Sequence, residues 1–335
     1  MKTVKIWFNR WFSTAYHIIN LIKKDKEINF YIIGSSPNPD SVVKEACDEW
    51  CPEPGKVSDD EYIEFCYKFC ITHDIDIFVP RHNQSIISKY RKSFEDIGVK
   101  ILADDYQIVS QLQNKASAYN LIEKKHIGNI PDYYVIHNSE EFKKAYRSMS
   151  MKYENLCFKF TTDEGGCSFR IIDNKPPSPF RRSVNHTSID TVIKDIETVG
   201  SRCPEIIIMP VLSGDEVSVD CLKTQQGNIM IPRFKSNTRA EYIKYDDDIL
   251  NSCKDFLNKI PLECPCNIQF RYLDNVPYFL EVNTRMSGGI HMTCLASGIN
   301  IPNIAVNKVL GINKPWVLNK QNIKITHIET PVLLK

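Results

Sequence analysis

The sequence lacks an excess of either charge. Its 335 residues include 42 Lys and Arg and 41 Asp and Glu, which gives a formal net charge of +1. A chain so close to neutral has no bulk attraction for polyanions, so neither nucleic acid nor an acidic membrane is expected as a partner. Apolar runs of the ~18 residues that a membrane-spanning helix requires are also missing, and residues 1–10 do not resemble a signal peptide. We therefore expect a cytoplasmic protein.

Internal repeats, low-complexity tracts and the G-x-G-x-x-G turn of dinucleotide-binding folds are absent as well. The missing turn argues against an NAD-binding domain. What is present is ordinary for a globular protein: 42% hydrophobic and 25% charged residues. The length is sufficient for two or three domains with cores of their own.

Cysteine, in contrast, is plentiful. The twelve cysteines are spread through apolar segments, and in a reducing compartment they are most simply small buried hydrophobic residues. Two pairs, Cys47/Cys51 and Cys66/Cys70, are spaced i, i+4, so each could face one side of a helix. A zinc site would require all four thiols to converge. The family spacing signatures of such sites are missing, so core packing is the favoured interpretation.

The first third of the chain alternates predicted strands and helices. The predicted elements are strands at 4–8, 29–33, 75–79 and 99–102 and helices at 13–24, 59–73 and 85–94. This order implies an open, mostly parallel sheet. A further helix is expected over 105–125, with Lys115 at its middle.

From Asp132 onward the strands become more frequent. The predicted elements are strands at 133–136, 157–160, 169–172, 206–210, 217–223, 229–231, 265–272 and 277–283, and helices at 139–148, 189–199, 246–259 and from about 301. Hairpin turns are expected at Gly227-Asn228 and Asp274-Asn275. The tail, 312–335, is weakly patterned.

Polar side chains on the last predicted hairpin form the most informative pattern. Glu281 and Asn283 are two positions apart on a strand and project to one face, and the hairpin brings Gln269 beside them. A carboxylate and two amide oxygens suit a hard cation that keeps phosphate oxygens as its other ligands. Arg285 continues the same face and could clamp a phosphoryl group. Each residue alone would fit a polar surface hairpin, but the four together, followed by a glycine pair, favour a metal–phosphate site.

A second segment could contact phosphate. Lys159 ends a strand, and the turn after it contains Gly165 and Gly166. Glycines let backbone N–H groups approach phosphate oxygens closely, although most such turns are simple hairpins. Asp163 and Glu164 in the same turn would repel a phosphate, so we expect both to point outward.

A third segment, residues 209–216, could hold an adenosine. A strand and a short connector are followed by Glu216, seven positions after Met209. Backbone groups of the connector would contact the purine edge, and Glu216 would accept from the ribose hydroxyls. Taken alone, a hairpin with an exposed acid is the better interpretation.

The order and spacing of these segments resemble the ATP-grasp superfamily, and most of all the ATP-binding domains of carbamoyl-phosphate synthase large subunits. Residues 267–270 (Asn-Ile-Gln-Phe) and 280–285 (Leu-Glu-Val-Asn-Thr-Arg) look like the family motifs N-x-Q-F and x-E-x-N-P-R, with Thr284 in place of the usual proline. The resemblance at motif level covers about residues 75–311.

The resemblance implies a fold that combines α/β and α+β parts. A Rossmann-like parallel sheet, the pre-ATP-grasp domain, is expected at 1–112, and a two-lobed ATP-grasp fold follows it. The small lobe with a linker helix would occupy 113–204, and the large lobe with the metal site 205–311. Residues 312–335 would form a C-terminal tail.

The resemblance also implies roles for single residues, with ATP and two Mg²⁺ ions (Mn²⁺ as an alternative) as cofactors. The expected catalytic cations are Lys115, Lys159 and Arg285. The expected metal ligands are Gln269, Glu281 and Asn283. The other nucleotide contacts, to phosphate, adenine and ribose in turn, would come from Gly165, Gly166 and Ser168, from Pro210 and Leu212, and from Glu216. A looser set of substrate contacts consists of Arg81, Lys235, Arg239, Gly288, Gly289 and His291.

Two departures from the family pattern bear on specificity. Met209 stands where a hinge glutamate is usual, which could weaken nucleotide binding. Residues 81–84 (Arg-His-Asn-Gln) replace a more acidic pattern at the carboxyl end of a predicted strand, where ligands bind in open α/β sheets. The second substrate is therefore expected to differ from that of better-known members.

The function that the resemblance implies is an ATP-dependent carboxylate–amine (or carboxylate–thiol) ligase that works through an acyl phosphate. Its substrates would be small molecules, such as an amino acid or a related carboxylate. Two alternatives stay open at this point: a regulatory nucleotide-binding protein with a degenerate site, and an enzyme that phosphorylates in the manner of carbamoyl-phosphate synthase. Oligomeric state is open too, with a homodimer as one alternative.

Overall fold

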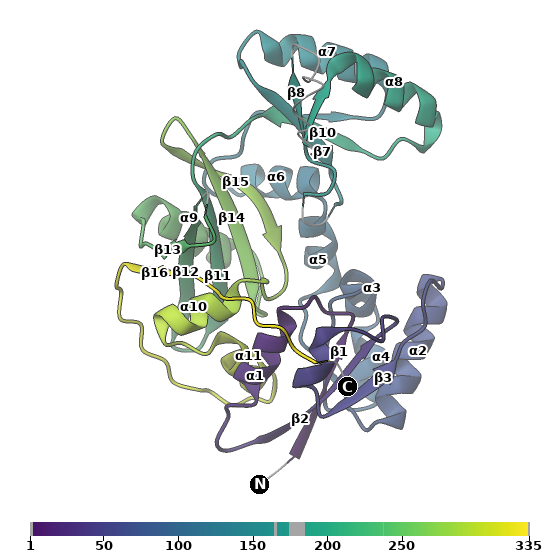
Figure 1. Ribbon diagram of the computed structural model, residues 1–335, viewed down its shortest axis with the longest axis vertical. Coiled ribbons are helices and arrows are strands. Elements are labelled where there is room, and N and C mark those ends of the chain that lie inside the picture. Colours follow the sequence, from purple (N-terminus) through teal and green to yellow (C-terminus); the bar gives the residue numbers. More distant parts are fainter. Residues whose placement is uncertain (1–2, 164–165, 174–184, 237, 334–335) are drawn as a thin grey trace. The chain divides into compact units, whose positions relative to one another are not determined.

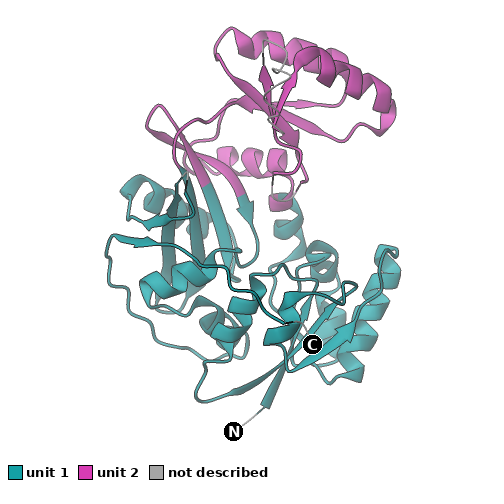
Figure 2. Ribbon diagram, viewed as in Figure 1, with its two compact units in different colours: residues 1–111, 216–269, 282–335 teal, residues 112–215, 270–281 magenta. Residues whose placement is uncertain are grey.

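The computed structural model describes residues 3–163, 166–173, 185–236 and 238–333. These residues form three β-sheets with accompanying helices (Figure 1). The chain divides into two compact units (Figure 2): unit 1 contains residues 1–111, 216–269 and 282–335, and unit 2 contains residues 112–215 and 270–281. The four-part division expected from the sequence stays a prediction.

Unit 1 begins with a parallel sheet of five strands in the order β3-β2-β1-β4-β5. Its strands are β1 Thr3–Asn9, β2 Asn29–Ser36, β3 Glu49–Pro52, β4 Ile77–Val79 and β5 Lys100–Ile101. The predicted N-terminal parallel sheet is thus confirmed. The edge strand β3 was not predicted, because its Glu-Trp-Cys-Pro sequence offers no apolar run.

Both faces of this sheet are buried, as parallel sheets require. On one face Trp7 stacks between Phe69 and Phe78, with ring centroids 4.2 and 4.0 Å away. On the other face Ile6 and Phe8 belong to a core that also contains residues of the six-stranded sheet of unit 1, among them Ile229. The two faces therefore belong to separate hydrophobic clusters, and the second one joins the N-terminal sheet to the other sheet of unit 1.

The helices of unit 1 begin at residues that cap them. Ser58 and Glu61 form a capping box at the start of α2 (Asp59–Thr72), and Asp246 accepts the Ile249 N–H at the start of α9 (Asp247–Lys259). The other helices here are α1 Ala15–Ile22, the 3₁₀ turn η1 Val42–Ala46, α3 Gln84–Lys89, α4 Arg91–Asp96, α5 Tyr106–Gln113, α10 Ile290–Ser297 and α11 Ile301–Val309. Helix α5 ends just beyond the boundary of the unit.

Three local predictions were wrong. The helix expected over 85–94 is divided between α3 and α4 at Tyr90. The helix expected over 105–125 is divided at Asn114, whose side chain accepts the Ser117 N–H and starts a new helix, so Lys115 opens a helix instead of lying in the middle of one. The hairpin turn expected at Gly227-Asn228 lies two residues earlier, at 225–226, because Gly227 already pairs with Thr224.

A six-stranded sheet has the order β15-β14-β11-β12-β13-β16. Its strands are β11 Glu216–Thr224, β12 Gly227–Lys235, β13 Glu241–Ile243, β14 Cys266–Leu273, β15 Val276–Asn283 and β16 Ile323–Ile325. The turn predicted between the last two long strands is confirmed: Asp274 and Asn275 have φ angles of 51° and 63°, the left-handed values of a type I′ hairpin. Residues 270–281 of this hairpin belong to unit 2.

Unit 2 contains the remaining sheet, in the order β6-β10-β7-β8-β9. Its elements are α6 Lys115–Lys124, β6 Tyr134–Ile136, α7 Ser139–Ser150, β7 Leu156–Phe160, β8 Arg170–Asp173, β9 His186–Ser188, α8 Ile189–Val199, the 3₁₀ turn η2 Gly200–Arg202 and β10 Ile206–Pro210. Phe142 of α7 and Val192 of α8 pack into one core with Phe158 and Ile208 of the sheet.

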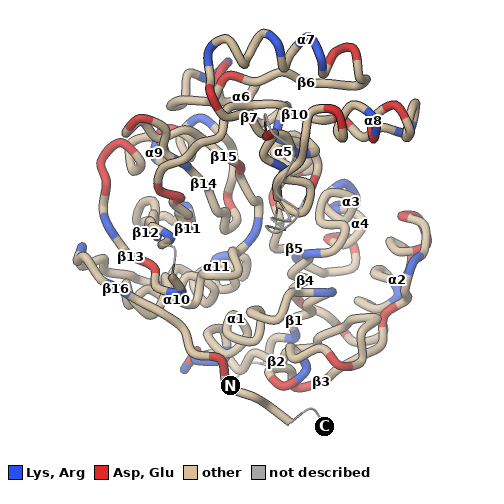
Figure 3. Tube along the Cα trace, turned by 45° about the horizontal axis from the view of Figure 1, so that its top comes forward, with Lys and Arg blue, Asp and Glu red and all other residues tan. Residues whose placement is uncertain are grey.

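The distribution of charged residues and the positions of the cysteines can now be compared with the expectations from the sequence. Helices α2 and α7 each carry acidic residues in the first turn and one or more basic residues further along (Figure 3). Among the described residues, no helix is long and apolar enough to cross a bilayer. All twelve cysteines are free thiols. Cys66 and Cys70 lie in the core, while Cys47 follows η1 and Cys51 lies on β3, so the first cysteine pair does not share a helix face.

Candidate functional site

Two lysines predicted to contact phosphate lie within unit 2 and are nearly inaccessible to solvent. Lys115, the first residue of α6, is 4% exposed, and Lys159, near the end of β7, is 5% exposed. The Lys115 Nζ lies 3.9 Å from a carboxylate oxygen of Glu281. The Lys159 Nζ donates to the Leu280 carbonyl oxygen at 3.4 Å. The fold therefore gathers Lys115, Lys159 and Glu281 at one place.

The charge state of Lys159 reflects this crowding. Burial first, and the neighbouring Lys115 second, lower the pKa of Lys159 to about 8, against the opposing effect of Glu281. A buried ammonium beside a second one is costly unless an anion joins them. The arrangement therefore favours a polyanionic ligand at these two amines.

Asp163 does not point outward, so the prediction for its side chain was wrong. Its carboxylate accepts from the Lys115 Nζ at 2.8 Å, as does its backbone carbonyl. A buried ammonium needs a counter-charge, and in this structure Asp163 supplies it. Glu164 lies outside the described residues.

The turn after Lys159 is held by a short network. Ser168 donates from its backbone N–H and its hydroxyl to the Asp163 carboxylate, and its hydroxyl accepts the Phe160 N–H at 2.7 Å. Gly166 has a φ of +68°, which disfavours a side chain at this position. Gly165 lies outside the described residues. The Asp163–Ser168 contact thus links the predicted loop to Lys115.

The predicted adenine segment lies at the end of β10. Pro210 is the last residue of that strand and pairs with Leu156. Leu212 is buried beside Cys157 and Met209. The carbonyl oxygens of Met209 and Pro210 both accept from the Cys157 thiol at 3.6 Å. The segment therefore combines backbone acceptors with an apolar surround, the combination that a purine ring requires.

In unit 1, a chain of polar contacts orients Gln269. Its Nε2 donates to the Asn267 Oδ1 at 3.3 Å, and the Asn267 Nδ2 donates to Asp220 at 2.9 Å. The Gln269 Oε1, the atom that would ligate a metal, stays out of this hydrogen bond. Glu281 and Asn283 are alternate residues of strand β15, which places their side chains on one face of that strand. These oxygen donors are of the kind that Mg²⁺ prefers.

Arg233, which sequence reasoning missed, is the centre of that polar chain. It is 2% exposed and forms ion pairs with Asp220 and Glu241. It also donates to Thr293 at 2.8 Å and to Ser287 at 3.2 Å. Burial opposes the charge of Arg233, but the two carboxylates outweigh it and raise the pKa of the guanidinium. The signal was available: a charged residue in the apolar strand 229–234 demands a buried partner.

Gly288 and Gly289, from the predicted set of substrate contacts, have neighbours that leave little room for a side chain. A Cβ at Gly289 would lie 2.3 Å from the Arg233 Nη1, so the guanidinium packs directly on this glycine. A Cβ at Gly288 would lie 3.3 Å from the Thr14 hydroxyl. Gly289 is therefore required by the Arg233 cluster, and Gly288 by the segment after β1.

Two arginines flank one aromatic ring in unit 1. The guanidinium carbon of Arg81 lies 5.7 Å from the Phe12 ring centroid, and that of Arg285 lies 5.5 Å from it. His291 stacks on His17 with centroids 4.3 Å apart. Burial lowers the pKa of His291 to about 4, with a further contribution from His17, so its imidazole is neutral at pH 7. The structure thus places Arg81, one of the predicted substrate residues, against the same ring as the predicted catalytic Arg285.

The remaining predicted residues are Lys235, Glu216 and Arg239, and the first two contact each other. Lys235 and Glu216 form an ion pair across β12 and β11. Arg239 is 64% exposed at its side chain and pairs with Glu329 at 3.2 Å, so its contacts run to the C-terminal segment.

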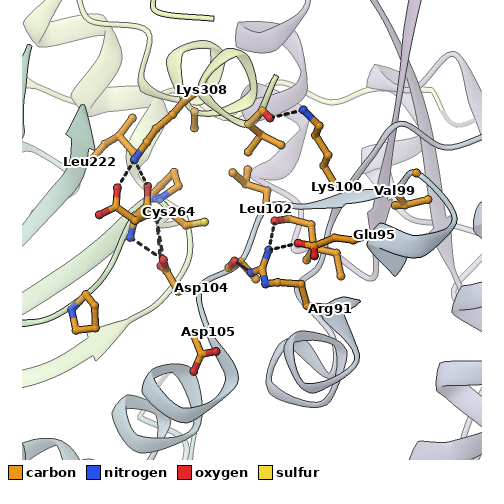
Figure 4. A pocket seen from close by; sticks show the side chains of 18 residues that line it. Arg91, Glu95, Val99, Lys100, Leu102, Asp104, Asp105, Leu222, Cys264 and Lys308 are labelled. Carbon is orange, nitrogen blue, oxygen red and sulfur yellow. Dashed lines mark hydrogen bonds and ion pairs between the residues drawn. The ribbon is translucent and has the colours of Figure 1, made fainter. Parts of the chain in front are cut away.

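A cavity without a predicted role lies elsewhere in unit 1. It has a volume of about 690 Å³ and is lined by none of the predicted site residues. Its charged groups are used by the chain itself (Figure 4): Asp104 accepts from the backbone of Glu263 and Cys264, and Lys100 and Lys308 donate to backbone carbonyls. These contacts join separate segments of unit 1 and do not converge on an empty centre.

Comparisons with known proteins agree with the motif analysis. Residues 202–331 match a family described as ATP-grasp in the biosynthetic pathway with Ter operon. The arginine-specific large chain of carbamoyl phosphate synthase from Geobacillus stearothermophilus is 23% identical over 236 residues, which are 66% of this chain and 21% of that one. The chain thus spans about a fifth of that relative.

Solved structures show the same fold. The biotin carboxylase domain of 2-oxoglutarate carboxylase from Hydrogenobacter thermophilus, crystallised as a dimer with MgADP and bicarbonate, aligns with a TM-score of 0.70 and 14% identity over 94% of this chain and 71% of that one. An ADP complex of N5-carboxyaminoimidazole ribonucleotide synthetase aligns with a TM-score of 0.67 and 16% identity, over 93% of this chain and 77% of that one. An L-amino acid ligase from Bacillus licheniformis aligns with a TM-score of 0.65 and 13% identity, over 92% of this chain and 74% of that one.

Proposed function

Because this chain belongs to the ATP-grasp superfamily, we propose that it is an ATP-dependent ligase that joins a small carboxylate to an amine, or to a thiol, through an acyl phosphate. The observation that carries the proposal is the pair of buried lysines, Lys115 and Lys159, beside Glu281. Two inaccessible ammonium groups and an acid are suited to the phosphates and metal of one nucleotide.

The residues of the proposed nucleotide site fit ATP and Mg²⁺ chemically. Lys115 and Lys159 would neutralise phosphate oxygens, and Asp163 would give up its bond to Lys115 as a phosphate takes its place. Bound ATP supplies the phosphoryl group, and Mg²⁺ neutralises the charge that develops on it. The assignment of Gln269, Glu281 and Asn283 to the same metal ions rests on the sequence motif and on the strand pattern of β15.

The proposed acid substrate would meet Arg81 and Arg285. Both guanidinium groups lie against the Phe12 ring, and arginine binds carboxylates with two parallel hydrogen bonds. Arg285 would bind and orient the carboxylate, and such positioning is what phosphoryl transfer mainly requires. His291, neutral at pH 7, would act there as a hydrogen-bonding group and not as a charge.

The test is carboxylate-dependent cleavage of ATP. The protein is incubated with ATP, Mg²⁺ and hydroxylamine, with one small carboxylate or amino acid at a time, and ADP and hydroxamate are measured. We expect both products to rise together with the correct acid, because hydroxylamine traps acyl phosphates. Glu281→Gln should abolish both, while Lys143→Met, at a half-buried residue of α7 outside the predicted site, should abolish neither.

The other outcomes separate the alternatives. ATP binding without ADP release for any carboxylate would contradict the ligase and favour a regulatory nucleotide-binding protein. ADP release with bicarbonate alone would favour a phosphorylating enzyme similar to carbamoyl-phosphate synthase.

A further inference from the structure

Three metal-binding side chains of different chemistry meet at the edge of the N-terminal sheet, and none of them belongs to the proposed active site. Glu49 and Cys51 lie two positions apart on the edge strand β3, so both project to the same face. His73 follows the last residue of α2 and reaches that face from the helix. One donor atom from each side chain lies within 4.8 Å of the other two.

The separations are close to those of a tetrahedral metal site. The Cys51 Sγ is 3.5 Å from the Glu49 Oε1 and 3.9 Å from the His73 Nε2, and the His73 Nδ1 is 3.1 Å from the Glu49 Oε1. Ligands bound to zinc at ~2.0–2.3 Å lie roughly 3.3–3.8 Å from one another. One ion can take only one nitrogen of His73, so binding requires the imidazole or the Glu49 carboxylate to reorient; one donor atom from each side chain already lies within 4.8 Å of the other two.

His73 is held in place by groups that do not take part in the cluster. Its ring stacks on Phe69 with centroids 4.2 Å apart, and its carbonyl oxygen accepts from the Lys5 Nζ at 2.9 Å. Glu49 has an outer partner as well, the Tyr31 hydroxyl at 3.4 Å. Supporting contacts of this kind orient metal ligands in proteins.

We propose that Glu49, Cys51 and His73 bind one zinc-type transition-metal ion, with water in the fourth position. Thiolate, imidazole and carboxylate are the three ligand types that zinc takes in proteins. A thiolate and an imidazole disfavour Mg²⁺, which requires oxygen ligands. The side chains of Glu49 and His73 are 38% and 23% exposed, so an ion can enter from solvent. Bound metal would tie the end of α2 to the edge strand.

The cluster replaces the four-cysteine site considered from the sequence. Cys66 and Cys70 are buried in the core against Trp7 and its neighbours, and the Cys47 thiol donates to the Val43 carbonyl oxygen. Of the four thiols, Cys51 alone is accompanied by a histidine and a carboxylate. A neighbouring cysteine, Cys47, therefore provides a matched control.

The experiment titrates metal-free, full-length protein with Zn²⁺ against a chromophoric chelator, without nucleotide and with excess Mg²⁺. We expect one Zn²⁺ per chain, and at least tenfold weaker binding for Cys51→Ser and for His73→Gln. Cys47→Ser should bind like the unaltered protein, and so should Glu281→Gln, which separates this site from the proposed nucleotide site. Circular dichroism checks that each variant is folded.

Co²⁺ provides a second readout that depends on the sulfur ligand. With Co²⁺ in place of Zn²⁺, the unaltered protein should show a sulfur-to-cobalt charge-transfer band that Cys51→Ser loses and Cys47→Ser keeps. The proposal is overturned if Zn²⁺ fails to bind in the presence of Mg²⁺, or if Cys51→Ser and His73→Gln bind it as tightly as the unaltered protein. Neither outcome would affect the proposed ligase activity.

Discussion

Two buried cations of this protein, Lys159 and Arg233, have almost the same exposure, 5% and 2%, but opposite surroundings. Arg233 lies between the carboxylates of Asp220 and Glu241 and donates to several hydroxyl groups. Lys159 has a second ammonium beside it and donates to a backbone carbonyl at 3.4 Å. The pKa of the arginine is raised accordingly, and that of the lysine is lowered.

Under the proposed function, the difference separates a cation that supports the fold from one that would bind a ligand. The charge of Arg233 is compensated by the chain itself, which makes the residue a fixed support for Asp220, Asn267 and, through them, Gln269. The charge of Lys159 is only partly compensated, so its environment becomes favourable when an anion arrives. Four experiments can break or sharpen this comparison.

The largest effect is expected on stability, from Arg233→Met. Removing the guanidinium leaves Asp220 and Glu241 as buried charges without their cation, which costs about 3–5 kcal/mol. Urea unfolding at pH 7 measures the change. The double variant Arg233→Met/Asp220→Asn should recover part of the loss. A change within about 0.5 kcal/mol for the single variant, as for a typical surface substitution, would contradict the supporting role.

Lys159→Met should have the reverse effect. Without the ammonium, catalysis should fall by roughly 10²–10³-fold, the loss typical of a removed transition-state charge contact. The free energy of unfolding should stay equal or rise, because a poorly compensated buried charge is gone. Kinetics and urea unfolding on the same preparation measure both. Loss of stability comparable to that of Arg233→Met would show that Lys159 is structural.

The pH dependence of nucleotide affinity should reveal the lowered pKa of Lys159. Since that pKa is about 8, the ammonium is lost above pH 8, and affinity for ADP should fall about tenfold between pH 8 and 9.5. The unfolded chain keeps its proton up to pH 10.5, so the contribution of Lys159 to stability rises over the same range. Lys159→Arg stays charged and should give a flat profile. A fall of equal size in this variant would assign the titration to another group.

The smallest effect is expected at the glycine pair. Gly289→Ala places a methyl group against the Arg233 guanidinium, and overpacking of this kind costs about 1–3 kcal/mol. Gly288→Ala is the matched control, because its nearest neighbour is the Thr14 hydroxyl at 3.3 Å and it should cost less. Thermal unfolding of both variants measures the difference. Equal melting temperatures would mean that Arg233 can move aside.

Sequence reasoning predicted the main elements because local patterns determine them. The apolar runs of β1 and β10 and the capping residues of α2 and α9 are visible in the sequence. Gln269, Glu281 and Asn283 were singled out by the strand pattern and the family motifs, and their role as metal ligands stays a prediction. The edge strand β3 was missed, since its pairing with β2 depends on tertiary context.

The missing parts of the site depend on contacts between distant residues. The direction of the Asp163 side chain is set by Lys115, 48 positions away, and no local pattern contains that information. The same holds for Arg233, whose partners come from three other elements, and for His73, which lies 22 positions from Cys51. For Arg233, the charged residue in an apolar strand was the one available signal. It indicates that a buried partner is needed, but it does not identify that partner.

The central claim is that the Lys159 ammonium binds the phosphates of a nucleotide. The most direct test is calorimetric titration of Mg-ADP at pH 7 into three proteins: the unaltered protein, Lys159→Met and Lys143→Met. The account predicts saturable binding of one ADP per chain, unchanged in Lys143→Met and at least tenfold weaker in Lys159→Met. Equal affinity in all three proteins, or no binding in any of them, would contradict it.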